Sequence, residues 1–148
     1  MREGTFKLTN EELQLMRVFE EITSVVPLDC VYDPQFDRYI FIVGRGQAAV
    51  AVGKNGSKVR LLKGVLKKEV EIVEGGENIE ELVKSALFPA KIAGVVVHEN
   101  GAQRVVIAKV TRDSLGFAIG RNGRNVHRAR ILLRRYFGVS DIRVMQHP

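Results

Sequence analysis

The chain has 148 residues, of which 45% are hydrophobic, and it carries a formal net charge of +6. This length suits one ordinary domain or two very small ones. No apolar run approaches the ~20 residues that span a bilayer, and the start Met1-Arg2-Glu3-Gly4 lacks an apolar signal segment, so we expect a cytoplasmic protein without membrane contact. The one cysteine, Cys30, cannot form an internal disulfide, and we expect it to be buried in a strand.

The first half of the chain predicts a helix, a hairpin, two helices around a glycine pair, and a last strand. Thr9-Asn10-Glu11-Glu12 is a capping box that opens the first helix, and Pro27 ends it. Turn residues over 33–37 separate strands that we expect over 28–32 and 39–43. A short helix over 47–52 then leads into Gly53-Lys54-Asn55-Gly56, before a helix over 57–67 and a strand over 69–73.

Residues 74–77 mark a boundary, after which the same order of elements returns. Asn78-Ile79-Glu80-Glu81 is a second capping box and opens a helix to about residue 87. Asn100-Gly101 is expected to turn a hairpin whose strands cover 92–98 and 104–110. A short helix from about residue 112 leads into Gly120-Arg121-Asn122-Gly123, before a helix over 124–136 and a strand over 141–145.

These elements predict two domains, residues 1–75 and residues 76–148. In each domain, helices would cover one face of a three-stranded sheet, which is an α+β fold. The two halves are also related in sequence, because a shift of 67 positions places Ala51-Val52-Gly53-Lys54-Asn55-Gly56 on Ala118-Ile119-Gly120-Arg121-Asn122-Gly123. Lys67-Lys68 falls on Arg134-Arg135 in the same alignment, so the chain reads as a duplication.

Basic residues gather after each glycine pair. Between Gly53 and Lys68 there are six cations and no acid, and between Arg112 and Phe137 the only acid is Asp113. Helix faces that are merely solvated usually mix both signs of charge. The segregation is therefore what we expect of a surface that binds a polyanion.

The glycine loops have a chemistry that suits a nucleic-acid backbone. Glycine lets the peptide approach a phosphate closely, and the loop amides with the start of the next helix supply hydrogen-bond donors and a positive dipole end. A structural alternative is that the loops are plain helix–helix turns with glycine caps. The candidate residues for binding such a backbone are Gly53, Lys54, Asn55, Gly56, Lys58, Arg60, Gly120, Arg121, Asn122, Gly123, Arg124 and Arg128.

The apolar residues beside the loops are expected to fill the core, although a few of them could line an aliphatic groove for bases. They are Val50, Val52, Val59, Phe117, Ile119 and Val126. An aromatic content of 7% without Trp argues against broad stacking platforms for bases. We see no metal-ligand spacing, Walker motif, nucleophile elbow or acid/base pair, and so expect no metal, no cofactor and no catalytic residue.

Two matched Gly-basic-Asn-Gly loops, each between two helical segments, resemble the KH module, whose GXXG loop clamps about four nucleotides. A helix and a hairpin before each loop and one strand after it resemble the type II KH arrangement, which implies a mixed sheet. Tandem type II modules with a minimal linker resemble the KH region of the NusA family, and residues 118–126 are especially similar to the second KH of archaeal NusA-like proteins. We find neither the polymerase-binding domain nor the S1 domain of bacterial NusA, which fits the short archaeal form.

The resemblance implies a protein that binds single-stranded RNA near a transcribing RNA polymerase. Such a protein would act in transcription elongation, termination or antitermination, and would not be an enzyme. A KH-type RNA-binding subunit in ribosome assembly or in an RNA-decay complex is the alternative function. An enzyme acting on nucleotides is a third and weaker alternative, because no catalytic set is recognisable.

Overall fold

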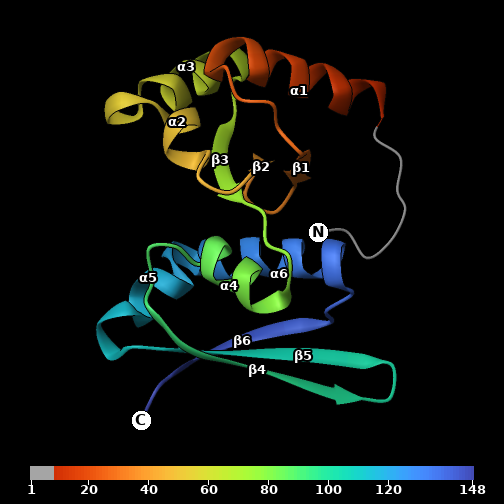
Figure 1. Ribbon diagram of the computed structural model, residues 1–148, viewed down its shortest axis with the longest axis vertical. Coiled ribbons are helices and arrows are strands. Elements are labelled where there is room, and N and C mark those ends of the chain that lie inside the picture. The colour runs from red at the N-terminus through yellow and green to blue at the C-terminus, as the bar shows by residue number, and fades with distance from the viewer. Residues whose placement is uncertain (1–8) are drawn as a thin grey trace. The chain divides into compact units, whose positions relative to one another are not determined.

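The computed structural model describes residues 9–148, so the stretch Met1-Arg2-Glu3-Gly4 lies outside the described residues. The described residues divide between Gly75 and Gly76 into two compact units, the N-terminal unit and the C-terminal unit. Each unit contains one three-stranded sheet (Figure 1). None of the helices within residues 9–148 is long and apolar enough to cross a membrane.

The N-terminal unit follows the predicted order of elements. They are α1 (Asn10–Thr23), β1 (Asp29–Asp33), β2 (Arg38–Val43), α2 (Ala48–Val52), the single turn η1 (Lys54–Gly56), α3 (Ser57–Leu66) and β3 (Glu69–Glu74). The strand order is β1-β2-β3, in which β1 is antiparallel to β2 and β3 is parallel to it. The parallel pair needs a crossover, and α2 and α3 supply it.

The C-terminal unit repeats this topology. Its elements are α4 (Ile79–Ala86), β4 (Ile92–Asn100), β5 (Gln103–Val110), η2 (Arg112–Ser114), α5 (Leu115–Ile119), η3 (Arg121–Gly123), α6 (Arg124–Phe137) and β6 (Asp141–Gln146). The antiparallel pair β4–β5 and the parallel pair β5–β6 make the second mixed sheet. The predicted α+β fold with a mixed sheet in each half is therefore confirmed.

Local signals in the sequence set most of the element ends. The capping box at Thr9 is formed, with the Thr9 hydroxyl and the Glu12 carboxylate each accepting the other residue's amide at 3.1 Å. The Asn78 side chain caps α4 by accepting the Glu81 amide at 2.9 Å. The hairpin turn lies one residue later than predicted, because Asn100 still pairs with Gln103 and Gly101 begins the turn at a φ of +63°.

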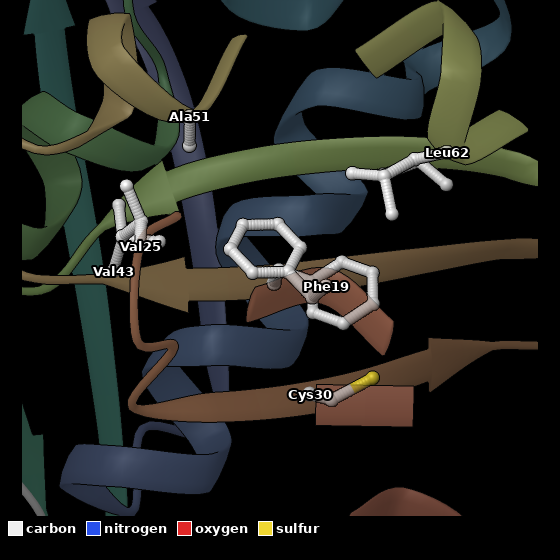
Figure 2. Packing of buried hydrophobic residues seen from close by; sticks show 8 residues of the cluster. Phe19, Val25, Cys30, Val43, Ala51 and Leu62 are labelled. Carbon is white, nitrogen blue, oxygen red and sulfur yellow. The ribbon is translucent and has the colours of Figure 1, made fainter. Parts of the chain in front are cut away.

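The core of the N-terminal unit lies between its sheet and the helices α1, α2 and α3 (Figure 2). Phe19 of α1 stacks on Phe41 of β2, with ring centroids 4.4 Å apart. Ala51 of α2 and Leu62 of α3 are fully buried in the same cluster. Cys30 is 1% exposed in β1, which confirms its predicted burial in a strand.

A buried ion-pair network joins the three strands of the N-terminal unit. The guanidinium of Arg38 is fully buried, and its Nε donates to Asp33 Oδ2 at 2.7 Å while Nη1 donates to both oxygens of Glu71 at 3.0 Å. The same cation lies 4.9 Å from the ring centroid of Phe36. A buried cation is tolerated only when it is paired in this way, so the network fixes the hairpin against β3.

Candidate nucleic-acid interface

The two glycine loops have the same backbone conformation. Gly53 has φ +79° and ψ 168°, and Gly120 has φ +76° and ψ 170°. The asparagines inside the loops are left-handed in both units, with φ +56° at Asn55 and +57° at Asn122. The duplication read from the sequence is therefore also a duplication of loop geometry.

The first glycine of each loop is required by its own backbone conformation and by a neighbouring side chain of the protein. Its φ and ψ lie in a region that only glycine occupies readily. A Cβ added at Gly53 would lie 2.7 Å from Lys58 Cγ, and one added at Gly120 would lie 2.8 Å from Asn125 Cγ. The space on the Cβ side of this glycine is thus filled by the second residue of the next helix.

The second glycine of each loop has a more open surrounding. A Cβ added at Gly123 would meet no described atom closer than Val126 Cγ1 at 3.8 Å, and one at Gly56 would lie 3.2 Å from Nη1 at the far end of the Arg60 side chain. Gly56 and Gly123 form the N-caps of α3 and α6. The second glycine is therefore the position where the loop can be approached closely from outside.

The helices that follow the loops begin without a side-chain cap. Neither α3 nor α6 has an acidic residue in its first turn, so nothing from that turn opposes the positive end of the helix dipole. Lys54 and Arg121 lie beside these helix starts and are exposed. Neither side chain makes a hydrogen bond or an ion pair with any residue in the part of the chain that the structure describes.

The other predicted site residues are placed in two different ways. Asn55 and Asn122 are exposed in the loops, and Arg124 is the half-buried first residue of α6. Arg60 donates from Nη1 to the carbonyl of Asn55, so it contacts the loop itself. These residues lie on or next to the predicted glycine loops.

Lys58 and Arg128, in contrast, are turned toward the ends of other helices. Lys58 Nζ donates to the carbonyl of Thr23 at 3.0 Å and to that of Val50 at 3.3 Å. Arg128 donates from Nε at 3.0 Å and from Nη2 at 2.6 Å to the carbonyl of Ala86. Both side chains are half-buried.

Asn125 is a site residue that sequence reasoning missed. Its side-chain amide donates to the carbonyl of Phe117 at 2.7 Å. The 67-residue shift places Asn125 on Lys58 and Phe117 on Val50, so the two bonds are equivalent. That alignment was the signal that could have identified it.

The expectation that the apolar residues beside the loops fill the core is wrong for three of them. Val50, Phe117 and Ile119 are 49%, 60% and 38% exposed. A helix of five residues buries only one narrow face, and the buried positions in α2 and α5 are taken by Ala51 and Ala118, both fully buried. An exposed apolar side chain therefore stands next to each loop.

Models of known protein families match both units. A family model described as a KH domain matches residues 16–87, and one described as a NusA-like second KH domain matches residues 79–146. The two matches together run from within α1 to the end of β6.

Individual relatives match over nearly the whole chain. A protein of Halobacterium salinarum named "Probable transcription termination protein NusA" is 36% identical over 140 residues, which are 95% of this chain and 99% of that protein. A protein of the same name from Methanocaldococcus jannaschii is 30% identical over 94% of this chain and 75% of its own length. The crystal structure of APE1850 superimposes with a TM-score of 0.85 at 38% identity, over 93% of this chain and 99% of that one.

Proposed function

The chain belongs to the NusA-like family of KH proteins, and from this premise we propose that it binds single-stranded RNA through both glycine loops and acts in transcription. The step of transcription that we propose is termination or antitermination during elongation. Relatives that match almost the whole chain bear the name of a transcription termination protein.

The observation that carries the RNA-binding proposal is the matched electrostatics of the two loops. In each unit a helix begins at a glycine without a side-chain cap, and an exposed cation without a partner among the described residues lies beside it. A helix start without a side-chain cap, its positive dipole end and a full charge at one place are the arrangement that a phosphate prefers. Two such places suit a sugar–phosphate chain rather than a single anion.

The bases of a bound single-stranded RNA would pack on the exposed apolar residues beside the loops. Val50 and Phe117 occupy equivalent positions in the helices that lead into the loops. When the backbone of a single strand is held at a GXXG loop, its unstacked bases need an apolar surface. One RNA that reaches both loops would gain affinity from the effective concentration of the second site.

Reversal of the loop charges tests RNA binding directly. The variant combines Lys54→Asp with Arg121→Asp, and we expect its affinity for a single-stranded RNA to fall by about 100-fold or more, because two charge-assisted contacts are lost. Fluorescence anisotropy with a labelled oligonucleotide measures the affinity, and circular dichroism checks that the fold is intact.

The matched control changes the same net charge elsewhere. Arg17→Asp in α1 with Lys84→Asp in α4 alters one exposed cation in the first helix of each unit. The control should keep its affinity within about threefold, since it alters the long-range field and the exposed Lys84–Glu80 ion pair but no group of the loops. Equal losses in the two double variants would show that net charge, and not the loops, drives the binding.

Copurification tests the proposed role in transcription. We expect RNA polymerase to be recovered with the protein from its native source after crosslinking. Recovery of ribosome-assembly factors or of RNA-decay subunits, without polymerase, would reject the transcription role while leaving RNA binding in place.

A further inference from the structure

We infer that Lys58 in the N-terminal unit, and Asn125 together with Arg128 in the C-terminal unit, are positioning residues that hold each glycine loop in place. They act on the loop through carbonyl groups of neighbouring helices and do not touch RNA. This inference deepens the proposed RNA-binding function and rests on it.

The need for such residues arises at helix ends. The last four carbonyls of a helix have no amide partner within that helix. Thr23 is the last residue of α1, and Val50 lies in the last turn of α2, which ends where the chain turns at Gly53. The Lys58 ammonium bonds both carbonyls, at 3.0 and 3.3 Å, so a single cation joins α1, α2 and α3.

In the C-terminal unit two side chains, instead of one, bond the equivalent carbonyls. Asn125 stands at the position of Lys58 and bonds the carbonyl of Phe117 at 2.7 Å. Arg128, at the fifth position of α6, bonds the carbonyl of Ala86, the last residue of α4, at 3.0 and 2.6 Å. Leu61 stands at the fifth position of α3 and cannot make that bond. Equivalent carbonyls, one at the end of the unit's first helix and one in the short helix before the loop, are thus bonded in both units by different residues.

The first glycine of the loop ties this arrangement to the loop's shape. Gly53 leaves room for the Lys58 side chain, and Gly120 leaves room for that of Asn125, since a Cβ at either glycine would lie under 3.0 Å from it. The positioning side chain therefore passes directly in front of the loop backbone on its way to the helix ends. Its loss would let the loop move, without removing any group that faces outward.

The inference is tested by building the side chains of the C-terminal unit into α3 of the N-terminal unit. Lys58→Asn alone leaves the Thr23 carbonyl without its cation. Adding Leu61→Arg copies the arrangement of the C-terminal unit and restores the charge. The charge-matched control adds Val65→Arg instead, at a position that is 54% exposed and one turn further along α3.

The first measurement needs no RNA. The Gly56 amide donates to the Gly53 carbonyl at 3.0 Å, and its hydrogen exchange reports loop opening. We expect exchange in Lys58→Asn to be about tenfold faster than in the unaltered chain, because a charge-assisted hydrogen bond is lost. The double variant Lys58→Asn with Leu61→Arg should return to within about twofold of the hydrogen-exchange rate of the unaltered chain. The control, Lys58→Asn with Val65→Arg, should keep the faster rate.

The second measurement separates positioning from contact with RNA. Lys58→Asn should weaken RNA binding about tenfold with an unchanged salt slope, and Leu61→Arg should restore the affinity. A residue that neutralises a phosphate would instead lower the slope by about 0.7 on its removal. That lower slope, unchanged Gly56 exchange, or equal rescue by Val65→Arg would overturn the inference. If the unaltered chain binds no single-stranded RNA, the proposed function fails, and the exchange rates alone decide the positioning role.

Discussion

The two glycines of one loop should differ in what their replacement costs. In Gly120→Ala the new Cβ would lie 2.8 Å from Cγ and Nδ2 of Asn125 and 3.0 Å from its backbone nitrogen. The backbone at φ +76° and ψ 170° adds about 1–3 kcal/mol of strain for a residue with a side chain. Displacement of Asn125 also breaks its bond to the Phe117 carbonyl, which costs about 1 kcal/mol.

Gly123→Ala should be much milder. Nothing described lies within 3.8 Å of the new Cβ, and the conformation at φ +79° and ψ 16° is left-handed, which costs about 1–2 kcal/mol. The reduced freedom of the unfolded chain offsets about 0.4–1 kcal/mol of this. We therefore expect Gly120→Ala to lower the free energy of unfolding by about 3 kcal/mol and Gly123→Ala by about 1 kcal/mol.

Urea unfolding of the full chain measures the difference. With a slope of about 2 kcal/mol/M, a gap of about 2 kcal/mol separates the two midpoints by about 1 M. Gly123→Asn serves as control and should unfold close to the unaltered protein, because asparagine visits the left-handed region readily. Equal midpoints for the two alanine variants, or a lower one for Gly123→Ala, would refute the assignment of different roles.

Three further outcomes are expected. Asp33→Ala removes one of the two carboxylates that pair with the buried Arg38 cation and should lower the free energy of unfolding by about 3 kcal/mol in a urea titration, whereas a loss under about 0.5 kcal/mol would contradict that account. Phe117→Ala removes a side chain that is 60% exposed, so stability should change by about 1 kcal/mol or less while RNA affinity falls about tenfold in anisotropy. The Arg130 guanidinium lowers the pKa of Asp141 despite some burial, so the stability from this pair is present above the unfolded carboxyl pKa of about 3.9 and is lost as pH falls through the folded value. The melting-temperature advantage over Asp141→Asn should accordingly shrink as the pH is lowered below about 3.9, and an advantage that does not change with pH would contradict the pairing.

Signals that lie within a few residues of each other predicted the fold well. The capping box at Thr9, the glycine loops and the repeated order of elements each depend on local chemistry, and they placed the start of α1 and both ends of α3 and α6 close to the observed bounds. The end of α1 was wrong, because the helix stops at Thr23 before a left-handed Ser24 and does not run on to Pro27. The mixed sheet followed from the resemblance to KH modules, because strand order is a tertiary property that no local pattern encodes. The hairpin turn was displaced by one residue, since Asn100 and Gln103 extend the strand pairing beyond the predicted ends.

The candidate site was only partly predictable, because some side chains are placed by partners far away in the chain. A basic residue in the first turn of α3 is expected to face a ligand, but Lys58 reaches the carbonyl of Thr23, 35 residues earlier. The apolar pattern of α2 could not show that Ala51 takes the one buried position and leaves Val50 outside. The buried Arg38 network was missed for the same reason, since Glu71 lies 33 residues from its partner.

The salt dependence of RNA binding tests the central claim most directly. For a single strand, the logarithm of the association constant falls with the logarithm of salt concentration by about 0.7 per neutralised phosphate. Neutralising the two loop cations in Lys54→Gln with Arg121→Gln should therefore reduce the slope by about 1.4, with the fold unchanged by circular dichroism. A slope equal to that of the unaltered chain would show that the two glycine loops do not hold the phosphates.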